Sequence, residues 1–224
     1  MKTAIIVSAI AEWEGVKPLF PEARMQRFPF GEFFDTTVGR WRVTFFHAGW
    51  GKIASAGAIQ YVIDHFAPDL IVNLGTCGGF EGVVQQGEVI LVERTIVYDI
   101  VELMGDLNIS TYYASSLDLS WLPGPEPHPA RRGLIVSADS DLPPEKIPFL
   151  RAKEALAADW ESAALAWVAN RNAARLLILR AVSDIVSEKG GEAYDNIELF
   201  NDRAKRIMKR LIEQLPDWLD CVRL

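Results

Sequence analysis

The sequence predicts an α/β protein, a three-layer sandwich in which a mostly parallel, twisted central sheet is flanked by helices. Short apolar runs without polar alternation are separated by longer helical patterns, as expected for parallel strands covered on both faces. Of the 224 residues, 50% are hydrophobic and 24% are charged, a composition typical of ordinary folded domains. Because no Pro/Gly/Ser-rich linker divides the chain, we expect a single domain over residues 1–224.

The first part of the chain supplies three expected strands and one helix. The strands lie at residues 4–9, 42–47 and 69–74, and the helix lies at residues 52–66. The Gly-Trp-Gly of residues 49–51 ends the second strand, and Pro68 closes the helix. The third strand runs into the glycine-rich residues 75–79, which we expect to form a turn that allows a ligand or another backbone to approach closely.

The second part of the chain continues the alternation. Further strands are expected at residues 88–93, 133–138 and 176–182, and helices at residues 152–172 and 195–215. The first of these helices has a break or a new start near Asp159, and Pro216 stops the second. Proline at alternate positions within residues 121–129 forbids a helix there and favours an extended surface loop.

Charge and cysteine content narrow the classes of partner. The chain has 23 basic and 30 acidic residues, a formal net charge of -7, which is the wrong sign for following a phosphate backbone. Cys77 and Cys221 are too few for a disulfide framework, so we expect a reducing, cytoplasmic location. Ser8 and Glu12 interrupt the first apolar run too early for a signal peptide, and no run reaches the roughly 18 apolar residues of a membrane helix. We therefore expect neither a nucleic acid nor a membrane as partner.

Three acidic side chains occupy positions where an α/β protein binds ligands. Glu12 follows the first strand and Asp184 follows the last, at the carboxyl ends of their strands. Glu161 stands near a helix start, where a carboxylate is favoured by the positive end of the helix dipole. These residues could meet in one cleft. They could equally be a solvated cap (Glu12), a dipole complement (Glu161) and a loop cap (Asp184).

Other candidate residues also have structural interpretations. The tryptophans Trp50 and Trp160 are most often core residues, although a planar base would pack against such a ring. Cys77 is most simply a small buried residue. The three scattered histidines do not form a metal-ligand cluster, and residues 75–79 lack the Lys-Ser/Thr ending of a phosphate-binding loop. From the residues alone, the prediction is an α/β enzyme with a carboxylate-lined cleft.

Five short segments, taken in order, resemble the nucleoside phosphorylase superfamily, and within it the methylthioadenosine/S-adenosylhomocysteine nucleosidases. They are residues 9–12, residues 47–52 (His-Ala-Gly-Trp-Gly-Lys), residues 72–79 (Val-Asn-Leu-Gly-Thr-Cys-Gly-Gly), residues 159–162 (Asp-Trp-Glu-Ser) and residues 180–184 (Arg-Ala-Val-Ser-Asp). The resemblance implies hydrolysis of the N-glycosidic bond of a purine-type ribonucleoside, with a 5′-modified one such as methylthioadenosine among the candidates. It also implies a homodimer that needs no metal or organic cofactor, with a small-molecule nucleoside and water as its partners.

The resemblance assigns roles that suit this chemistry, because a ribosyl–base bond breaks through an oxocarbenium-like sugar. Asp184 would donate a proton to the purine N7, and Ser183 would orient it. Glu161 would accept hydrogen bonds from the ribose hydroxyls. Glu12 would take a proton from the attacking water. The remaining implied site residues lie near the ribose, the water or the base: Thr76, Arg180, Cys77, Gly78, Trp160, Asp141 and Leu142.

Two departures from the family bear on the substrate. Trp160 replaces the methionine that lies beneath the nucleoside, and Asp141 falls where the nucleosidases place a phenylalanine against adenine. Placing Glu12 also requires a one-residue deletion in the alignment, so Glu14 is a second candidate for the base. We prefer Glu12 because Val16 and Phe20 then fall on one face of the following helix, as in the family.

Several alternatives remain open at this point. Bacterial purine phosphorylases hold phosphate partly with an arginine two residues before the glycine turn, and this chain has Asn73 there, which favours hydrolysis. Arginines elsewhere could substitute for it, for example Arg24, Arg27 or Arg40. The alternatives are a phosphate-dependent nucleoside phosphorylase, an enzyme like futalosine hydrolase, and a nucleoside-binding protein without turnover.

Overall fold

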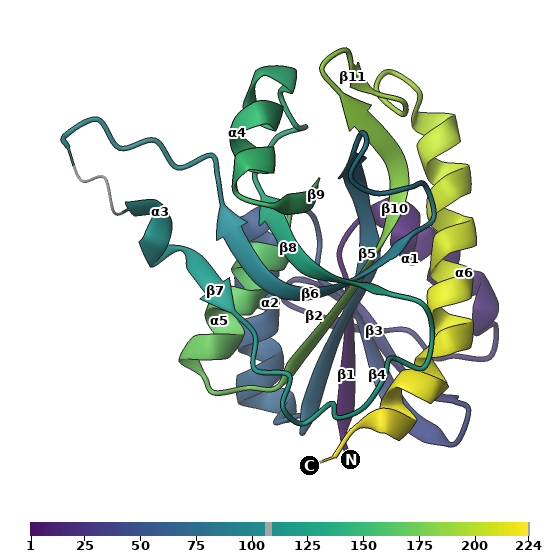
Figure 1. Ribbon diagram of the computed structural model, residues 1–224. Coiled ribbons are helices and arrows are strands. Elements are labelled where there is room, and N and C mark those ends of the chain that lie inside the picture. Colours follow the sequence, from purple (N-terminus) through teal and green to yellow (C-terminus); the bar gives the residue numbers. More distant parts are fainter. Residues whose placement is uncertain (106–108, 224) are drawn as a thin grey trace.

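Strands and helices alternate through the computed structural model, which describes residues 1–105 and 109–223 (Figure 1). The strands are β1 (Thr3–Val7), β2 (Gln26–Phe28), β3 (Gly31–Val38), β4 (Trp41–His47), β5 (Leu70–Phe80), β6 (Val89–Val97), β7 (Ala114–Ser116), β8 (Arg131–Ser137), β9 (Ala155–Asp159), β10 (Leu176–Ser187) and β11 (Gly190–Gly191). The helices are α1 (Ile10–Val16), α2 (Gly51–Phe66), α3 (Ile109–Tyr112), α4 (Ile147–Ala152), α5 (Ser162–Arg171) and α6 (Ile197–Cys221), with 3-10 turns η1 (Lys17–Leu19) and η2 (Pro144–Lys146). None of the helices in these two ranges is long and apolar enough to span a bilayer.

The strands form one mixed sheet, in the order β11-β10-β6-β8-β9-β5-β1-β4-β3-β2, with β7 paired to β6. Parallel pairs such as β1–β5 and β5–β10 occur beside antiparallel pairs such as β6–β10 and β5–β9. Because β5 pairs with both β9 and β10, the strands β5, β10, β6, β8 and β9 close into a ring. The α/β class is confirmed, but the sheet is mixed and not clearly mostly parallel: in the ring, β6–β10 and β5–β9 are antiparallel, whereas β5–β10, β6–β8 and β8–β9 are parallel. The apolar run of a strand that is covered on both faces does not indicate whether the neighbouring strands are parallel or antiparallel to it.

Helices cover both faces of the sheet (Figure 1). Alternate residues of β1 point to opposite faces, as the pleat requires. Ile5 packs in a core cluster with residues of α1 and α6, including Trp13 and Leu211. Ile6 packs on the other face with residues of α2 and α5, such as Ile59 and Leu165. This double coverage explains why the first apolar run shows no polar alternation.

The glycine-rich segment after residue 74 is strand and not the expected turn. β5 continues to Phe80, and Gly78 pairs with both Ala158 of β9 and Asp184 of β10. A Cβ atom built on Gly79 would lie 2.5 Å from Val84 Cγ2. The glycines therefore permit close packing inside the ring of strands rather than a reversal of the chain.

Two further expectations are corrected. Residues 155–159, expected as helix, form β9, because these small buried residues pair with β8 and β5 and complete the ring. Helix α6 does not stop at Pro216 but continues to Cys221, with Trp218 and Leu219 fully buried in its last turns. The antiparallel β2–β3 pair was not predicted, whereas residues 121–129 contain no helix or strand, as expected.

Candidate active site

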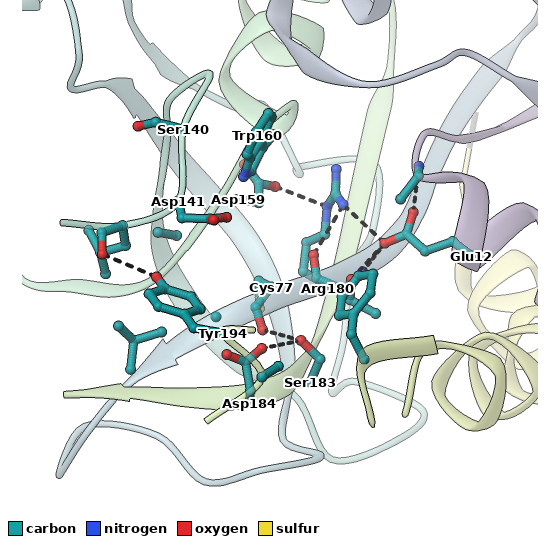
Figure 2. Close-up of a pocket in the computed structure, with 18 of the residues that line it drawn as sticks. Glu12, Cys77, Ser140, Asp141, Asp159, Trp160, Arg180, Ser183, Asp184 and Tyr194 are labelled. Carbon is teal, nitrogen blue, oxygen red and sulfur yellow. Dashed lines mark hydrogen bonds and ion pairs between the residues drawn. The ribbon is translucent and has the colours of Figure 1, made fainter. Parts of the chain in front are cut away.

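A cavity of about 610 Å³ opens at the carboxyl ends of β1, β4, β8 and β9 and across the middle of β5 and β10. Its size is within the usual range for small-molecule sites. All of the site residues named from the sequence line it: Glu12, Thr76, Cys77, Gly78, Asp141, Leu142, Trp160, Glu161, Arg180, Ser183 and Asp184. Glu12, Glu161 and Asp184, from distant parts of the chain, therefore share one cavity. Figure 2 shows Glu12 and Asp184 among its lining residues.

Glu12 lies in the first turn of α1 with only 1% of its surface exposed. Its Oε1 accepts hydrogen bonds from the backbone N–H of Thr76 (2.6 Å) and from Thr76 Oγ1 (2.8 Å). Its Oε2 accepts one from the backbone N–H of Ala9 (3.1 Å). The interpretation of Glu12 as a solvated cap is therefore wrong. Glu14 is half exposed and pairs with Lys17 (2.5 Å), so of the two candidates only Glu12 faces the cavity.

Arg180 is the buried cation around which the carboxyl groups gather (Figure 2). Its guanidinium lies 3.1 Å from Asp159 Oδ2, 3.5 Å from Glu161 Oε2 and 3.8 Å from Glu12 Oε1. Burial alone would lower the pKa of Arg180, but the facing acidic groups outweigh it and raise the pKa, so the side chain stays charged.

One guanidinium cannot neutralise three buried carboxylates, and Glu161 is the one that remains protonated at neutral pH. Burial, opposed by Arg180 and reinforced by Asp159 and Glu12, raises the pKa of Glu161 to about 8. Glu161 is the N-cap residue of α5, but its side chain makes no capping hydrogen bond to that helix. Its Oε1 accepts a hydrogen bond from the backbone N–H of Gly51 (3.1 Å), the first residue of α2. The carboxyl group of Glu161 thus holds the start of α2 at the cavity. The expected role was different, namely to complement the dipole of the helix that follows Glu161 itself.

Asp184 lies at the opposite side of the cavity from Glu12 (Figure 2). Burial raises the pKa of Asp184, although the hydrogen bond with Ser183 opposes this shift. Ser183 Oγ lies 2.6 Å from Asp184 Oδ1 and 3.2 Å from the carbonyl oxygen of Cys77. A single hydroxyl proton cannot serve both acceptors, whereas a proton on Asp184 would make both contacts hydrogen bonds. The geometry therefore suits a carboxyl group that can carry and release a proton.

The two tryptophans are not core residues. Trp50 is 54% exposed and Trp160 is partly buried, and both line the cavity. Each could therefore present an aromatic face to a ligand. Cys77 is buried, as expected, and burial raises the pKa of its thiol well above the usual value, so it remains protonated.

Sequence reasoning missed two lining residues of chemical interest. The sequence marks Asp159 only as a helix break or start and as part of a family motif, yet its carboxylate pairs with Arg180 and accepts a hydrogen bond from Ser137 Oγ (2.5 Å). Its position at the end of a strand would have indicated it, had β9 been predicted. Tyr194 lies in the loop between β11 and α6, where no sequence pattern marked it.

The arginines that could have held phosphate lie elsewhere. Arg24, Arg27 and Arg40 are exposed and do not line the cavity. Asn73 is buried away from it and donates a hydrogen bond to the carbonyl oxygen of Ile6 (3.0 Å). Within the described residues, no group of three or more His, Cys, Asp or Glu side chains is placed to hold a metal ion.

Fold and site together define an α/β protein with a buried acid–base cluster at the carboxyl ends of its strands, an arrangement typical of enzymes. The sequence profile of the phosphorylase superfamily matches residues 4–215. The chain therefore belongs to the phosphorylase superfamily, which confirms the resemblance seen in its sequence.

Relatives and solved structures agree with this assignment. The 5′-methylthioadenosine/S-adenosylhomocysteine nucleosidase of Marinomonas sp. is 26% identical over 197 residues, covering 80% of this chain and 84% of that protein. The Streptococcus pneumoniae MTA/SAH nucleosidase in complex with 8-aminoadenine has a TM-score of 0.79 at 21% identity, covering 99% of this chain and 100% of that chain. A futalosine hydrolase mutant of Helicobacter pylori has a TM-score of 0.78 at 16% identity, covering 97% and 99%. At these identities, the likeness to the solved structures concerns the fold.

Proposed function

We propose that this protein is a nucleosidase that hydrolyses the N-glycosidic bond of a purine-type ribonucleoside. The observation that carries the proposal is the placement of two buried carboxyl groups, Glu12 and Asp184, at opposite sides of one cavity. Glycosidic hydrolysis needs an acid for the leaving group and a base for water. The names of the curated relatives, which are nucleosidases acting on 5′-methylthioadenosine and S-adenosylhomocysteine, support the same reaction and a 5′-modified substrate.

In the proposed reaction, the bond between C1′ and N9 breaks and its electron pair passes to the purine. Asp184 donates its proton to N7, and the neutral base leaves. Water attacks C1′ and loses a proton to Glu12, so the products are the free base and the free sugar. Glu161 accepts hydrogen bonds from the ribose hydroxyls, while Thr76 and Arg180 hold the neighbouring carboxylates in place.

Hydrolysis is favoured over phosphorolysis by the charges in the cavity. Arg180 is the only basic side chain among the described residues that line it. Its charge faces three carboxyl groups, so the described lining residues leave no free cation for a phosphate dianion.

The direct test is base release from a panel of purine ribonucleosides, with and without inorganic phosphate. We expect release without phosphate and free ribose as the second product. Strict dependence of base release on phosphate would show that the protein is a phosphorylase and not a nucleosidase. Calorimetric binding of nucleosides without any release would favour a binding protein.

We further propose that the protein acts in the cytoplasm as a homodimer. Both cysteines are free, which agrees with a reducing compartment. Trp50 and Ile53, at the start of α2 beside the cavity, are 54% and 87% exposed, and such apolar side chains suit a subunit interface. Sedimentation of the wild-type protein and of Ile53→Asp tests this state: we expect a dimer that the charged side chain weakens.

A further inference from the structure

A bulge in β10 carries the acid of the proposed reaction. The pairing of β10 with β5 shifts by one residue between Val182 and Asp184, so Ser183 has no paired residue on β5. A bulge of this kind redirects the side chains that follow it and leaves the backbone groups of the extra residue outside the ladder. Ser183 is also buried, and a buried carbonyl group needs a hydrogen-bond partner. Other parts of the chain must therefore hold the backbone at this point.

Two side chains donate hydrogen bonds to the carbonyl oxygen of Ser183. One is Arg203 on α6, whose Nη1 lies 3.0 Å away, and the other is Gln86 in the loop before β6, whose Nε2 lies 3.2 Å away. Gln86 is exposed, whereas only 15% of the Arg203 side chain is exposed. Arg203 is therefore the firmer support, and it acts on the peptide that joins Ser183 to Asp184.

Arg203 also holds the hairpin that covers Asp184. Its Nη1 carries two protons, and the second hydrogen bond goes to Glu192 Oε2 (3.0 Å). Glu192 directly follows β11, and its backbone N–H donates to the carbonyl oxygen of Ile185 (3.1 Å). A Cβ atom on Gly191 would lie 3.0 Å from Asp184 Oδ2, so this hairpin packs against the carboxyl group. Arg203 thus joins the bulge that carries the acid to the hairpin that covers it.

The charges of Arg203 and Glu192 act on Asp184 in opposite directions. Burial raises the pKa of Asp184, the positive charge of Arg203 lowers it, and the negative charge of Glu192 raises it. A general acid must hold its proton until the leaving group takes it. An unbalanced cation beside Asp184 would favour the carboxylate, so the balance between these two side chains matters for the reaction.

Other titratable groups of the cavity are neutral, exposed or on another side. Burial raises the pKa of the Cys77 thiol well above its usual value and the pKa of Tyr194 to about 12, so both groups are neutral at pH 7. Asp141 and Asp195 line the cavity and are exposed. Arg180 belongs to the carboxylate cluster on the Glu12 side (Figure 2).

We propose that Arg203 and Glu192 form a pair of positioning residues for the acid: Arg203 holds the bulge that aims Asp184 into the cavity, and Glu192 offsets the charge of Arg203 so that the acid keeps its proton. The inference rests on the proposed function for the role of Asp184 as proton donor. Neither Arg203 nor Glu192 lines the cavity, so both act through Asp184 and not on the substrate.

The test measures base release from a purine nucleoside across pH for Arg203→Met and Glu192→Gln. Arg203→Met removes the cation, so the alkaline decline in kcat should move to higher pH, and kcat should fall about ten-fold because the acid is less firmly held. Glu192→Gln leaves the cation unbalanced, so the decline should move to lower pH. We expect each shift to be about half a pH unit, since partly exposed charges are screened. Arg203→Lys keeps the charge and a donor and should restore most of the wild-type profile.

Arg210→Met is the matched control. Arg210 lies about two turns further along α6 and donates to the carbonyl oxygen of Gly87 (2.6 Å), so its variant loses the same kind of hydrogen bond away from the acid. It should unfold more easily in urea without moving the alkaline decline.

A riboside with p-nitrophenol as leaving group adds a second comparison, because p-nitrophenolate leaves without a proton. Arg203→Met should lose little activity on this riboside. If Arg203→Met loses equally on both substrates, or moves the decline no more than Arg210→Met does, Arg203 has only a structural role and the proposal is wrong.

Nuclear magnetic resonance provides a readout that does not depend on activity. The protein is labelled with 13C in its aspartate carboxyl groups, and the signal of Asp184 is the one missing from Asp184→Asn. Its titration midpoint should rise in Arg203→Met and fall in Glu192→Gln. Unchanged midpoints, or shifts in the same direction, would overturn the proposal. If no nucleoside is hydrolysed, the proposed function fails, and these midpoints alone decide whether Arg203 and Glu192 govern the proton of Asp184.

Discussion

Gly75 and Arg180 are paired residues on the adjacent parallel strands β5 and β10, and a Cβ atom on Gly75 would lie 2.3 Å from Arg180 Nη1. The same atom would lie 2.8 Å from Glu12 Oε1. The absence of a side chain on β5 therefore creates the space in which the buried guanidinium meets the carboxylate of α1. The next residue of β5, Thr76, also supports the ion cluster, because its backbone N–H and its hydroxyl both donate hydrogen bonds to Glu12.

Gly75→Ala is expected to damage both stability and activity. The added methyl group must displace Arg180 or Glu12, and disturbing a buried ion cluster costs about 3 kcal/mol or more. Urea denaturation should report the loss of stability, and base release should fall by more than the loss of folded protein explains. Gly57→Ala is the control: the atoms nearest to its methyl belong to the exposed Phe30 ring, so any loss of stability there involves no buried charge and should leave base release per folded molecule unchanged. Wild-type stability in Gly75→Ala would show that the cluster has more room than this geometry allows.

Glu161 makes stability depend on pH. Its pKa of about 8 in the folded protein exceeds the usual 4.5, so between these values the folded state holds a proton that the unfolded state releases. The contribution of the protonated Glu161 to folding stability is fully present below pH 4.5 and is lost as the pH rises through about 8. Glu161→Gln should therefore be more stable than wild type at pH 8, by on the order of 3 kcal/mol, and little different at pH 4.5.

The measurement is urea denaturation at both pH values, with the exposed Glu22→Gln as control. Equal pH slopes for wild type and Glu161→Gln would mean that Glu161 is ionised in the folded protein. At pH 8 and above, where Glu161 ionises, base release by Glu161→Gln should be lower despite its greater stability, because an amide accepts fewer hydrogen bonds from two ribose hydroxyls than a carboxylate.

The sequence predicted the residues of the site better than the sheet that carries them. Glu12 and Asp184 follow apolar runs, and the carboxyl ends of strands are where ligands bind, so their convergence could be expected. The pairing of β5 with both β9 and β10 could not, because it depends on contacts between segments about 80 to 100 residues apart. Residues 155–158 are three alanines and a leucine, good helix formers that become strand only because neighbouring strands lie on either side of them.

The site residues that the sequence did not indicate were missed for the same reason, because their positions depend on contacts between distant segments or on irregular loops. Asp159 enters the ion cluster because β9 ends beside Arg180, and nothing in its own neighbourhood indicates this partner. Tyr194 reaches the cavity from an irregular loop, where no periodicity predicts the direction of a side chain. The size of Trp50 favours the core but also suits a face for a planar base, and only the structure decides between them: the side chain stands at the start of α2, is 54% exposed and lines the cavity.

Glu12→Gln and Glu14→Gln form a matched pair on one helix. Glu12 is buried in the cavity and Glu14 is an exposed partner of Lys17, so the same chemical change tests two positions two residues apart. We expect kcat to fall about 100- to 10,000-fold for Glu12→Gln, the usual contribution of a general base, and to change little for Glu14→Gln. Both variants should fold, because glutamine can still accept from Thr76. A large loss confined to Glu14→Gln would reassign the base.

Asp184→Asn tests the proposed acid. Asparagine can keep the contact with Ser183 but has no proton to transfer, so kcat for purine release should fall about 100- to 10,000-fold while the fold is preserved. Burial raises the pKa of Asp184, and the acid acts only when protonated, so wild-type release should decline as pH rises through that raised pKa. The variant should lack this decline.

A riboside with p-nitrophenol as leaving group separates this role from mere positioning, because p-nitrophenolate departs without being protonated. If Asp184 donates the proton, Asp184→Asn should lose far less activity on this riboside than on a purine nucleoside. If Asp184 only shapes the cavity, both substrates should suffer equally, and the acid must then be sought elsewhere on the cavity wall. The exposed Asp202→Asn, on α6, is the control and should behave as wild type with both substrates.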